Sequence, residues 1–237
     1  MQGDFRGRRA LVTGAARKLG RAIALALGRG GADVAVHYRG SRTEAEETAA
    51  ELMRLGVRAP LVQGDQALDP ERIVHQAAAA LGGLDLLVCN AAEFEKVEAA
   101  ALTRAQFEAM LAKNLTGPFL LMQAALPHLR ASRGAIVTLL DLCGTTQVWK
   151  GYAHYAAAKA GLAALTRLLA LEWAPEVRVN GVAPGAITAD DAALLKRIPL
   201  QRIGTAEEVA AAVLFLLSQE FVTGQILPVD GGRSVNP

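Results

Sequence analysis

The stretch Arg9-Ala10-Leu11-Val12-Thr13-Gly14-Ala15-Ala16-Arg17-Lys18-Leu19-Gly20 begins as a short apolar strand and ends in a glycine turn. Residues 21–29 continue with helical periodicity, so the segment predicts a strand, a turn and a helix in that order. A turn of this kind lets the pyrophosphate of a dinucleotide approach the backbone and meet the positive end of the helix dipole. The alternative interpretation is a tight strand-to-helix connection without a ligand. Lys18 stands where a middle glycine is common, so the turn carries two adjacent cations, Arg17 and Lys18.

Short apolar segments and helical segments alternate along the rest of the chain, with no linker, repeat or low-complexity tract between them. This alternation predicts an α/β fold, a single doubly wound domain of the Rossmann type with a parallel sheet and helices on both faces. We expect one domain over residues 1–237, with seven strands at 9–13, 32–38, 57–63, 84–90, 134–140, 178–183 and 225–229. The expected helices lie near 18–29, 42–55, 70–81, 103–131, 154–174 and 206–218. The candidate substrate lid is the segment of about 188–205, with a short helical stretch at 190–197.

The end of the second expected strand reads His37-Tyr38-Arg39-Gly40-Ser41 and has no carboxylate. An enzyme that uses NAD places an acid there for the ribose 2′-hydroxyl. Guanidinium groups match the geometry and the charge of a phosphate, so Arg39, Lys18 and Arg17 are suited to surround a 2′-phosphate, with Ser41 as a hydroxyl donor. The pattern therefore favours NADP(H) over NAD(H). The alternative is that these cations are ordinary solvated side chains.

Tyr155 and Lys159 are four residues apart, so on a helix both side chains lie on one face, a turn apart. A free phenol has a pKa of about 10, and a nearby cation stabilises the phenolate and lowers that value. General acid catalysis by Tyr155 then becomes feasible at neutral pH. A tyrosine and a lysine at this spacing more often make a surface contact, and the rest of the chain decides between the two interpretations.

The order of these elements resembles the short-chain dehydrogenase/reductase family over nearly the whole chain. The resemblance rests on Thr13-Gly14 with Gly20, Asp65 after the third strand, Asn90-Ala91-Ala92 after the fourth, Asn114 inside a helix, Tyr155 with Lys159, Pro184-Gly185, and Thr223-Gly224-Gln225 through Val229-Asp230-Gly231-Gly232. It implies that Asp65 contacts adenine, that Asn90 stabilises the central strand, and that Asn114 holds a water in a proton relay to Lys159. It also implies a set of cofactor-binding residues, namely Gly14, Arg17, Lys18, Leu19, Gly20, His37, Tyr38, Arg39, Ser41, Asp65, Asn90, Ala91, Tyr155, Lys159, Pro184, Gly185 and Ile187.

Asp141 departs from the family pattern, because it follows the fifth expected strand where most relatives have a serine. A carboxyl group polarises a ketone only when it is protonated, but it can relay a proton to a ring nitrogen or pair with an amino-substituted heterocycle. This residue, the turn at 15–20 and the run at 37–41 resemble the pteridine reductases. Phe94 falls where those enzymes stack the pterin between an aromatic ring and the nicotinamide.

Two departures from the pteridine reductases leave the substrate open. Ala92-Glu93 replaces the Ser-Ser of that subgroup, and the interval from Asp141 to Tyr155 is one residue longer than usual. The alternative interpretation of Asp141 is a carboxylate in a turn at the end of a strand, in an altered active site. The alternative for Phe94 is an aromatic side chain of a loop that covers the core.

The combined prediction is hydride transfer from NADPH to an electron-poor C=N or C=O carbon, with the nicotinamide chemistry belonging to the cofactor. Tyr155 would donate the proton, Lys159 would lower its pKa and hold the nicotinamide ribose, and Asn114 would complete the relay. Phe94, Asp141 and Tyr155 would contact the substrate, a pterin of the dihydropteridine or dihydrofolate kind. The alternatives are an NADPH-dependent ketoreductase for a 3-oxoacyl thioester or small carbonyl compound, and a catalytically silent NADP(H)-binding sensor.

The bulk composition favours a soluble enzyme over a nucleic-acid or membrane protein. The 237 residues are 52% hydrophobic and carry a net charge of +2, and there is no basic run or zinc-type spacing. We expect no metal, and a cytoplasmic location fits both the lone cysteines Cys89 and Cys143 and an N-terminus without an apolar signal core. The apolar faces of the helices near 103–131 and 154–174 predict a homotetramer, as in resembling enzymes. His154 is expected on an exposed helix face, and the alternative is that it lines the pocket next to Tyr155.

Overall fold

The computed structural model describes residues 4–187 and 192–235, and seven parallel strands form one sheet in this part of the chain. The strands are β1 (Arg9–Val12), β2 (Asp33–Tyr38), β3 (Leu61–Gln63), β4 (Leu86–Cys89), β5 (Ala135–Leu139), β6 (Arg178–Pro184) and β7 (Ile226–Val229). Their order in the sheet is β3-β2-β1-β4-β5-β6-β7. The chain therefore winds outward from β1 in both directions, which confirms the doubly wound Rossmann-type fold.

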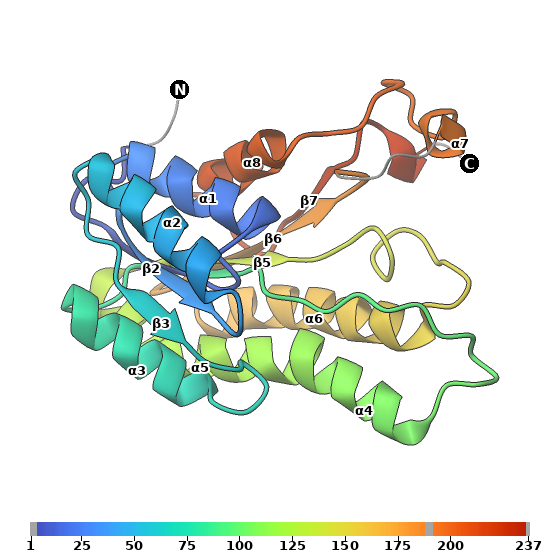
Figure 1. Cartoon of the computed structure of the whole chain (residues 1–237), viewed down its shortest axis with the longest axis horizontal. Helices are drawn as coiled ribbons and strands as arrows, with labels where there is room; N and C mark the ends of the chain where they lie inside the picture. The colour runs from blue at the N-terminus through green and yellow to red at the C-terminus, as the bar shows by residue number, and fades with distance from the viewer. Residues whose placement is uncertain (1–3, 188–191, 236–237) are drawn as a thin grey trace.

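Helices cover both faces of the sheet (Figure 1). One face carries α1 (Lys18–Arg29), α2 (Arg42–Arg54) and α8 (Ala206–Ser218), and the other carries α3 (Pro70–Leu81), α4 (Arg104–Leu111), α5 (Gly117–Ser132) and α6 (Ala153–Glu172). A π-helical turn, Ala112–Thr116, joins α4 to α5. Short helices follow at α7 (Ala192–Leu195) and at Arg233–Val235. Since all strands are parallel, their carboxyl ends meet at one edge of the sheet, where ligands of such folds bind.

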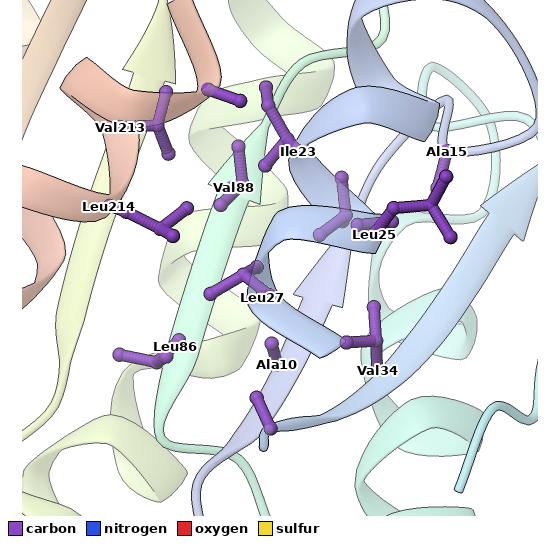
Figure 2. Packing of buried hydrophobic residues seen from close by; sticks show 14 of the residues in the cluster. Ala10, Ala15, Ile23, Leu25, Leu27, Val34, Leu86, Val88, Val213 and Leu214 are labelled. Atoms are coloured by element: carbon purple, nitrogen blue, oxygen red, sulfur yellow. The ribbon is translucent and has the colours of Figure 1, made fainter. Parts of the chain in front are cut away.

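Neighbouring residues of β1 point into two separate apolar cores, because side chains alternate across a strand. Ala10 and Val12 join the core beneath α1, and Leu11 joins the core on the other face. Figure 2 shows Ile23 and Leu27 of α1 over this first core. Burial on both faces explains why the strands read as continuous apolar runs. Each such leucine or isoleucine contributes about 1.5–3 kcal/mol relative to exposure.

The third strand is shorter than the expected 57–63 and covers only Leu61–Gln63. Pro60 has no N–H to donate to a neighbouring strand, so regular pairing begins after it. Its carbonyl still accepts a hydrogen bond from the Val36 N–H at 2.9 Å. The prediction of a strand in this segment is therefore correct, but Pro60 shortens the part that pairs regularly with β2 to Leu61–Gln63.

The long helix expected over 103–131 is interrupted by the π-helical turn. In this turn the Gly117 N–H donates to the Ala112 carbonyl, five residues earlier. Pro118 has no N–H for the Asn114 carbonyl, which is the bond an α-helix would require there. Turns of this kind are frequent at functional sites, and this one holds two residues of the site described below.

The other expected elements agree with the structure to within two residues at each end. Part of the candidate lid, residues 188–191, lies outside the described part of the chain, and α7 is the helical stretch expected within 190–197. Within the described ranges, no helix is long and apolar enough to cross a membrane.

Candidate active site

The glycine turn after β1 has the backbone shape that a closely approaching ligand needs. Gly14 has a φ of 64°, in the left-handed region that favours glycine. A Cβ on Gly20 would collide with the Gly14 carbonyl oxygen, so α1 begins directly against the turn. Lys18 also takes a left-handed φ, of 49°, which explains why glycine is common at this place. The amino end of α1 is thus open to an anionic group.

His37, expected to bind the cofactor, holds this turn in place. The Gly14 N–H donates to its Nδ1 at 3.1 Å, and its Nε2 lies 3.1 Å from the Gly64 carbonyl oxygen. The ring therefore carries its proton on Nε2 and donates it to Gly64. Burial lowers the pKa of His37 to about 4, so the ring is neutral at physiological pH. Sequence reasoning missed this structural role, because it depends on β2 lying beside β1.

A cavity of about 530 Å³ opens at the carboxyl ends of β1, β2 and β4. Its lining includes most of the predicted cofactor-binding residues: Gly14, Arg17, Lys18, Leu19, Gly20, His37, Tyr38, Arg39, Ser41, Asp65, Asn90 and Ala91. Gln66, Glu93 and Lys113 also line it, and sequence reasoning missed all three. The lining fits a dinucleotide, since the glycine turn suits a pyrophosphate and the cations suit a further phosphate.

The remaining predicted cofactor-binding residues do not line this cavity: they are Tyr155 and Lys159, described below, and Pro184, Gly185 and Ile187. Pro184 ends β6, and Gly185 and Ile187 follow it. A Cβ on Gly185 would lie 2.8 Å from the Asp230 Cα, so packing against the turn after β7 already requires glycine there. A role of these residues toward a cofactor stays a prediction.

Asn90 joins the ends of β1 and β4, in line with its expected role. Its Nδ2 donates to the Thr13 carbonyl at 2.8 Å, and Thr13 Oγ1 accepts from the Asn90 and Ala91 N–H groups, each at 2.9 Å. Gln66 Nε2 donates to the carbonyls of Ala91 and Lys113 at 2.9 and 2.7 Å. These bonds fix the cavity wall that faces the glycine turn.

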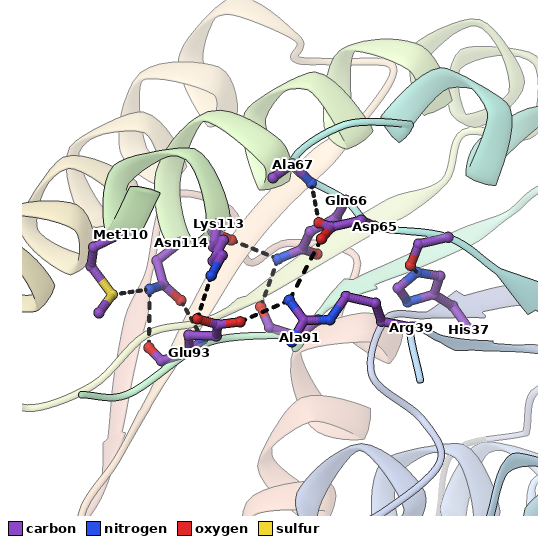
Figure 3. Close-up of polar contacts among 11 residues, drawn as sticks. His37, Arg39, Asp65, Gln66, Ala67, Ala91, Glu93, Met110, Lys113 and Asn114 are labelled. Atoms are coloured by element: carbon purple, nitrogen blue, oxygen red, sulfur yellow. Dashed lines mark hydrogen bonds and ion pairs between the residues drawn. The ribbon is translucent and has the colours of Figure 1, made fainter. Parts of the chain in front are cut away.

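Arg39, one of the cations expected to hold a 2′-phosphate, is paired with two carboxylates (Figure 3). Its Nη1 lies 2.7 Å from Glu93 Oε1 and 3.5 Å from Asp65 Oδ2. The second oxygen of Glu93 lies 2.6 Å from Lys113 Nζ. The cavity thus contains its own anions as well as the expected cations.

The side chain of Asn114 holds the backbone of Glu93. Its Oδ1 accepts from the Glu93 N–H and its Nδ2 donates to the Glu93 carbonyl, each at 3.0 Å. The side chain is buried in the π-helical turn. The water relay from Asn114 to Lys159 stays a prediction.

Tyr155, Asp141 and Lys159 meet where β5 ends beside the first turns of α6. The Tyr155 hydroxyl donates to Asp141 Oδ2 at 2.9 Å, and the other oxygen, Oδ1, accepts from the Cys143 N–H at 2.8 Å. Lys159 Nζ donates to the Leu139 carbonyl at 2.7 Å and lies 5.7 Å from the centre of the Tyr155 ring. The predicted catalytic tyrosine, lysine and aspartate therefore form one cluster.

The expectation that Lys159 lowers the pKa of Tyr155 is wrong for this arrangement. Burial, followed by the charge of Asp141 and the hydrogen bond to it, raises the pKa of Tyr155. Burial also raises the pKa of Asp141, although the bonds from Cys143 and Tyr155 and the charge of Lys159 oppose it. Burial lowers the pKa of Lys159 to about 8, against the opposing effect of Asp141. The cluster therefore holds its proton on the phenol.

An aromatic cluster borders the Tyr155 hydroxyl. Phe94 stacks on Tyr152 with ring centres 4.6 Å apart and meets Tyr155 edge-on at 4.9 Å. Trp149 lies edge-on to Phe94 at 6.4 Å, and the guanidinium of Arg233 lies 5.2 Å from the centre of the Trp149 ring. One face of Phe94 is thus covered by Tyr152. Sequence reasoning missed Tyr152, Trp149 and Arg233. The only signal for Tyr152 and Trp149 was the aromatic content between β5 and α6, and Arg233, which follows β7, had none.

His154 is buried, contrary to the exposed face expected for it. Neither ring nitrogen has a hydrogen-bond partner among the described residues. The helical periodicity near 154–174 did not reveal that the start of α6 is enclosed by neighbouring elements.

A doubly wound parallel sheet with a cavity of about 530 Å³ beside its glycine turn, and a tyrosine–lysine pair beyond it, is the arrangement of a nicotinamide-dependent oxidoreductase. The sequence model of the family described as Enoyl-(Acyl carrier protein) reductase matches residues 14–234. A cyclohexanol dehydrogenase of Rhodococcus sp. (strain TK6) is 39% identical over 96% of each chain. A 3-oxoacyl-(acyl carrier protein) reductase of Staphylococcus epidermidis is 35% identical over 94% of this chain and 97% of its own. The chain belongs to the short-chain dehydrogenase/reductase family.

Solved structures agree with this membership. A short-chain dehydrogenase from Burkholderia cenocepacia J2315, in complex with NADP, superimposes with a TM-score of 0.92 at 38% identity, over 98% of this chain and 99% of its own. An acetoin dehydrogenase from Enterobacter cloacae superimposes with a TM-score of 0.91 at 29% identity, over 97% and 96% of the two chains. The family resemblance drawn from the sequence is thereby confirmed.

Proposed function

We propose that this protein is an NADP(H)-dependent oxidoreductase that interconverts a carbonyl compound and its alcohol. The observation that carries the proposal is the Tyr155 hydroxyl, held by Asp141 at 2.9 Å in a buried site that also contains Lys159. A positioned phenol that keeps its proton can give it to a substrate oxygen. The similarity to a cyclohexanol dehydrogenase and to a 3-oxoacyl-(acyl carrier protein) reductase supports this substrate class over the pterin expected from the sequence.

The cofactor proposal rests on the charges around the cavity. Arg17, Lys18 and Arg39 would hold a 2′-phosphate with Ser41, and the glycine turn would hold the pyrophosphate. Tyr155 and Lys159 would contact the nicotinamide ribose. The NADP complex of the Burkholderia neighbour supports this choice. When bound, the nicotinamide supplies the hydride, and the protein supplies its placement and the proton.

Asp141 would take the place of the serine that most relatives carry. Because burial raises the pKa of Asp141, its carboxyl group stays protonated to a higher pH than a free carboxyl group does. The protonated form donates to a carbonyl oxygen, and the ionised form accepts from Tyr155 and keeps the phenol protonated. Lys159 balances the charge of Asp141, and Asn114 would link Lys159 to solvent through a water.

A pterin reductase is the second candidate, because Asp141 lies within hydrogen-bond distance of the proton-donating hydroxyl. Such a carboxyl group suits protonation of a ring nitrogen. Phe94 lies beside Tyr155, where a pterin reductase needs an aromatic ring to stack on its substrate. Tyr152, however, covers one face of the Phe94 ring. The third candidate is a catalytically silent sensor, which would bind NADPH but reduce no substrate.

A substrate panel separates these functions. NADPH oxidation would be followed with cyclohexanone, a 3-oxoacyl thioester, dihydrobiopterin and dihydrofolate, and NADPH binding by fluorescence titration. We expect turnover of the ketone or thioester. Turnover of the pterins alone would favour the second candidate, and binding without any turnover would favour the sensor.

We also propose a homotetramer and a substrate lid within a single domain covering 1–237. Leu168 and Leu171 of α6 are exposed apolar side chains, which supports burial of this helix against another copy. A monomer mass by light scattering at micromolar concentration would contradict the tetramer.

The lid, about 188–205, would be tested by the effect of Leu195→Ala on the KM for substrate and on cofactor affinity.

A further inference from the structure

Every polar group of Glu93 has a partner at the wall of the cofactor cavity. Its two carboxylate oxygens pair with Arg39, which follows β2, and with Lys113, which lies in the π-helical turn. Its backbone N–H and carbonyl are both held by the side chain of Asn114 (Figure 3). The carboxylate is therefore fixed beside the Arg39 guanidinium by contacts from two separate segments, the residues after β2 and the π-helical turn.

Glu93 carries a full negative charge in this position. Burial raises its pKa, but the hydrogen bonds from Lys113 and Arg39 outweigh burial, and the pKa is lowered overall. The carboxylate thus remains ionised at neutral pH. The charge of Arg39, which the cofactor would use, is already neutralised from within the protein.

Glu93 is a closer partner of Arg39 than Asp65 is. The Arg39–Glu93 contact of 2.7 Å is a charge-assisted hydrogen bond, whereas Arg39 and Asp65 are 3.5 Å apart. One oxygen of Asp65 also accepts from the Ala67 N–H at 2.9 Å. Glu93 is therefore the anion that a competing phosphate would have to displace or share.

Building on the proposed NADP(H) function, we propose that Glu93 is an internal counter-ion of Arg39 that competes with the cofactor's 2′-phosphate. A carboxylate and a phosphate are alternative partners for one guanidinium group. Lys113 keeps Glu93 paired when Arg39 turns to a phosphate, so the exchange leaves no isolated charge. A ribose without the phosphate makes no demand on Arg39, and the Arg39–Glu93 pair persists. Glu93 thus limits the affinity for NADP(H) and the preference for it over NAD(H).

The test is Glu93→Gln, which keeps the size of the side chain and removes its charge. Dissociation constants for NADPH, NADH, 2′,5′-ADP and 5′-AMP would be measured by calorimetric titration, with no turnover involved. We expect NADPH and 2′,5′-ADP to bind roughly threefold to fivefold more tightly, the range for removal of one half-exposed ion pair. NADH and 5′-AMP should change by less than about twofold, since neither carries the competing phosphate. Glu95→Gln is the matched control, because Glu95 lies in the same loop, is exposed and has no ion pair within the described residues.

A double-mutant cycle with Arg39→Gln separates competition from a general effect of charge. Without Arg39, Glu93→Gln should no longer improve NADPH binding, because the two effects act through one pair. An equal gain for NADPH and NADH, a loss for both, or a gain that persists without Arg39 would overturn the proposal. If wild type bound NADPH no better than NADH, the proposed cofactor itself would fail. Thermal unfolding of each variant would confirm that it is folded.

Discussion

The site has two ends: one around Arg39 and Glu93, where we propose that the adenosine of the cofactor binds (the adenosine end), and one around Tyr155 and Lys159 (the catalytic end). The charged side chains of the adenosine end are half exposed and paired with one another, whereas those of the catalytic end are buried. The side chains of Arg39 and Glu93 are 57% and 35% exposed, but Lys159 and Tyr155 are only 3% and 4% exposed. Water and salt screen the first group, and burial shifts the pKa values of the second. Substitutions at the adenosine end should therefore alter affinity by moderate, salt-dependent amounts. Those at the catalytic end should change proton transfer, with a strong dependence on pH.

Tyr155→Phe should show the contrast most clearly. It removes the hydroxyl that donates to Asp141 and leaves the cavity lining unchanged. We expect turnover to fall by at least about a hundredfold, the usual effect of losing a positioned acid. The dissociation constant for NADPH should change little. Turnover above about a tenth of the wild-type rate, measured by NADPH oxidation, would mean that another group donates the proton.

Replacing Lys18 and Arg39 together by alanine should affect binding instead. Two half-exposed charge contacts of about 1 kcal/mol each correspond to roughly thirtyfold weaker NADPH binding. NADH binding should change far less, and added salt should reduce the difference between the two cofactors. Fluorescence titrations at two salt concentrations test this. Equal losses for both cofactors would contradict a role in holding the 2′-phosphate.

Asp141→Ser should alter the direction and pH dependence of catalysis. Asp141 raises the pKa of Tyr155, so its removal should favour the phenolate that alcohol oxidation requires. We expect alcohol oxidation near pH 7 to increase on the order of tenfold, with ketone reduction retained. Asp141→Asn is the control that keeps the shape and removes the charge. A loss of both reactions in both variants would show that the carboxyl group itself is required, and loss of pterin turnover would support the second candidate.

The sequence predicted those parts of the site whose residues lie only a few positions apart in the chain. The Gly14–Gly20 turn follows from one strand running into one helix, and Tyr155 and Lys159 share a face because they are four residues apart on α6. The family and the order of elements followed from the same local patterns.

Contacts between distant loops were not predictable in this way. Glu93 meets Arg39 across 54 positions and Lys113 across 20, and no local pattern links them. The raised pKa of Tyr155 depends on burial and on Asp141, which a four-residue spacing does not encode. The preference for a pterin rested on Asp141, Phe94, the turn at 15–20 and the run at 37–41. The relatives that are similar over nearly the whole chain are instead a cyclohexanol dehydrogenase and a 3-oxoacyl-(acyl carrier protein) reductase.

Lys159→Met tests burial at the catalytic end through stability. The pKa of Lys159 is lowered from 10.5 to about 8 in the folded protein. Between these values the unfolded chain binds more protons than the folded protein, so the free energy of unfolding rises with pH. Below pH 8 both states are protonated, and the folded state bears the full cost of the buried charge. Wild type should therefore gain stability relative to Lys159→Met from about pH 8 to about pH 10.5, as measured by urea unfolding. A constant difference would show that the ammonium is not desolvated.

Lys18→Gly tests whether the adenosine end carries backbone strain for the sake of a charge. Lys18 has a φ of 49°, which costs a non-glycine residue about 1–2 kcal/mol, whereas glycine adopts it freely. Glycine also gains freedom in the unfolded chain, a loss of about 0.5–1 kcal/mol to stability. The net gain in the free energy of unfolding should be up to about 1.5 kcal/mol, the largest difference between these two effects.

The neighbouring residue provides the matched control, because Arg17 has an ordinary extended backbone with a φ of −142°. Arg17→Gly relieves no strain, so it should lower stability by about 0.5–1 kcal/mol through the unfolded chain. The exposed ion pair between Arg17 and Glu44, 3.6 Å apart, is also lost and adds at most about 1 kcal/mol to this decrease. Both variants remove a cation and should weaken NADPH binding more than NADH binding. Opposite changes in stability combined with similar losses in NADPH affinity would indicate that the strained conformation of Lys18 is retained for its charge. If Lys18→Gly lowered stability as much as Arg17→Gly, the left-handed backbone would carry no measurable strain, and the lysine would owe its place to contacts in the folded protein.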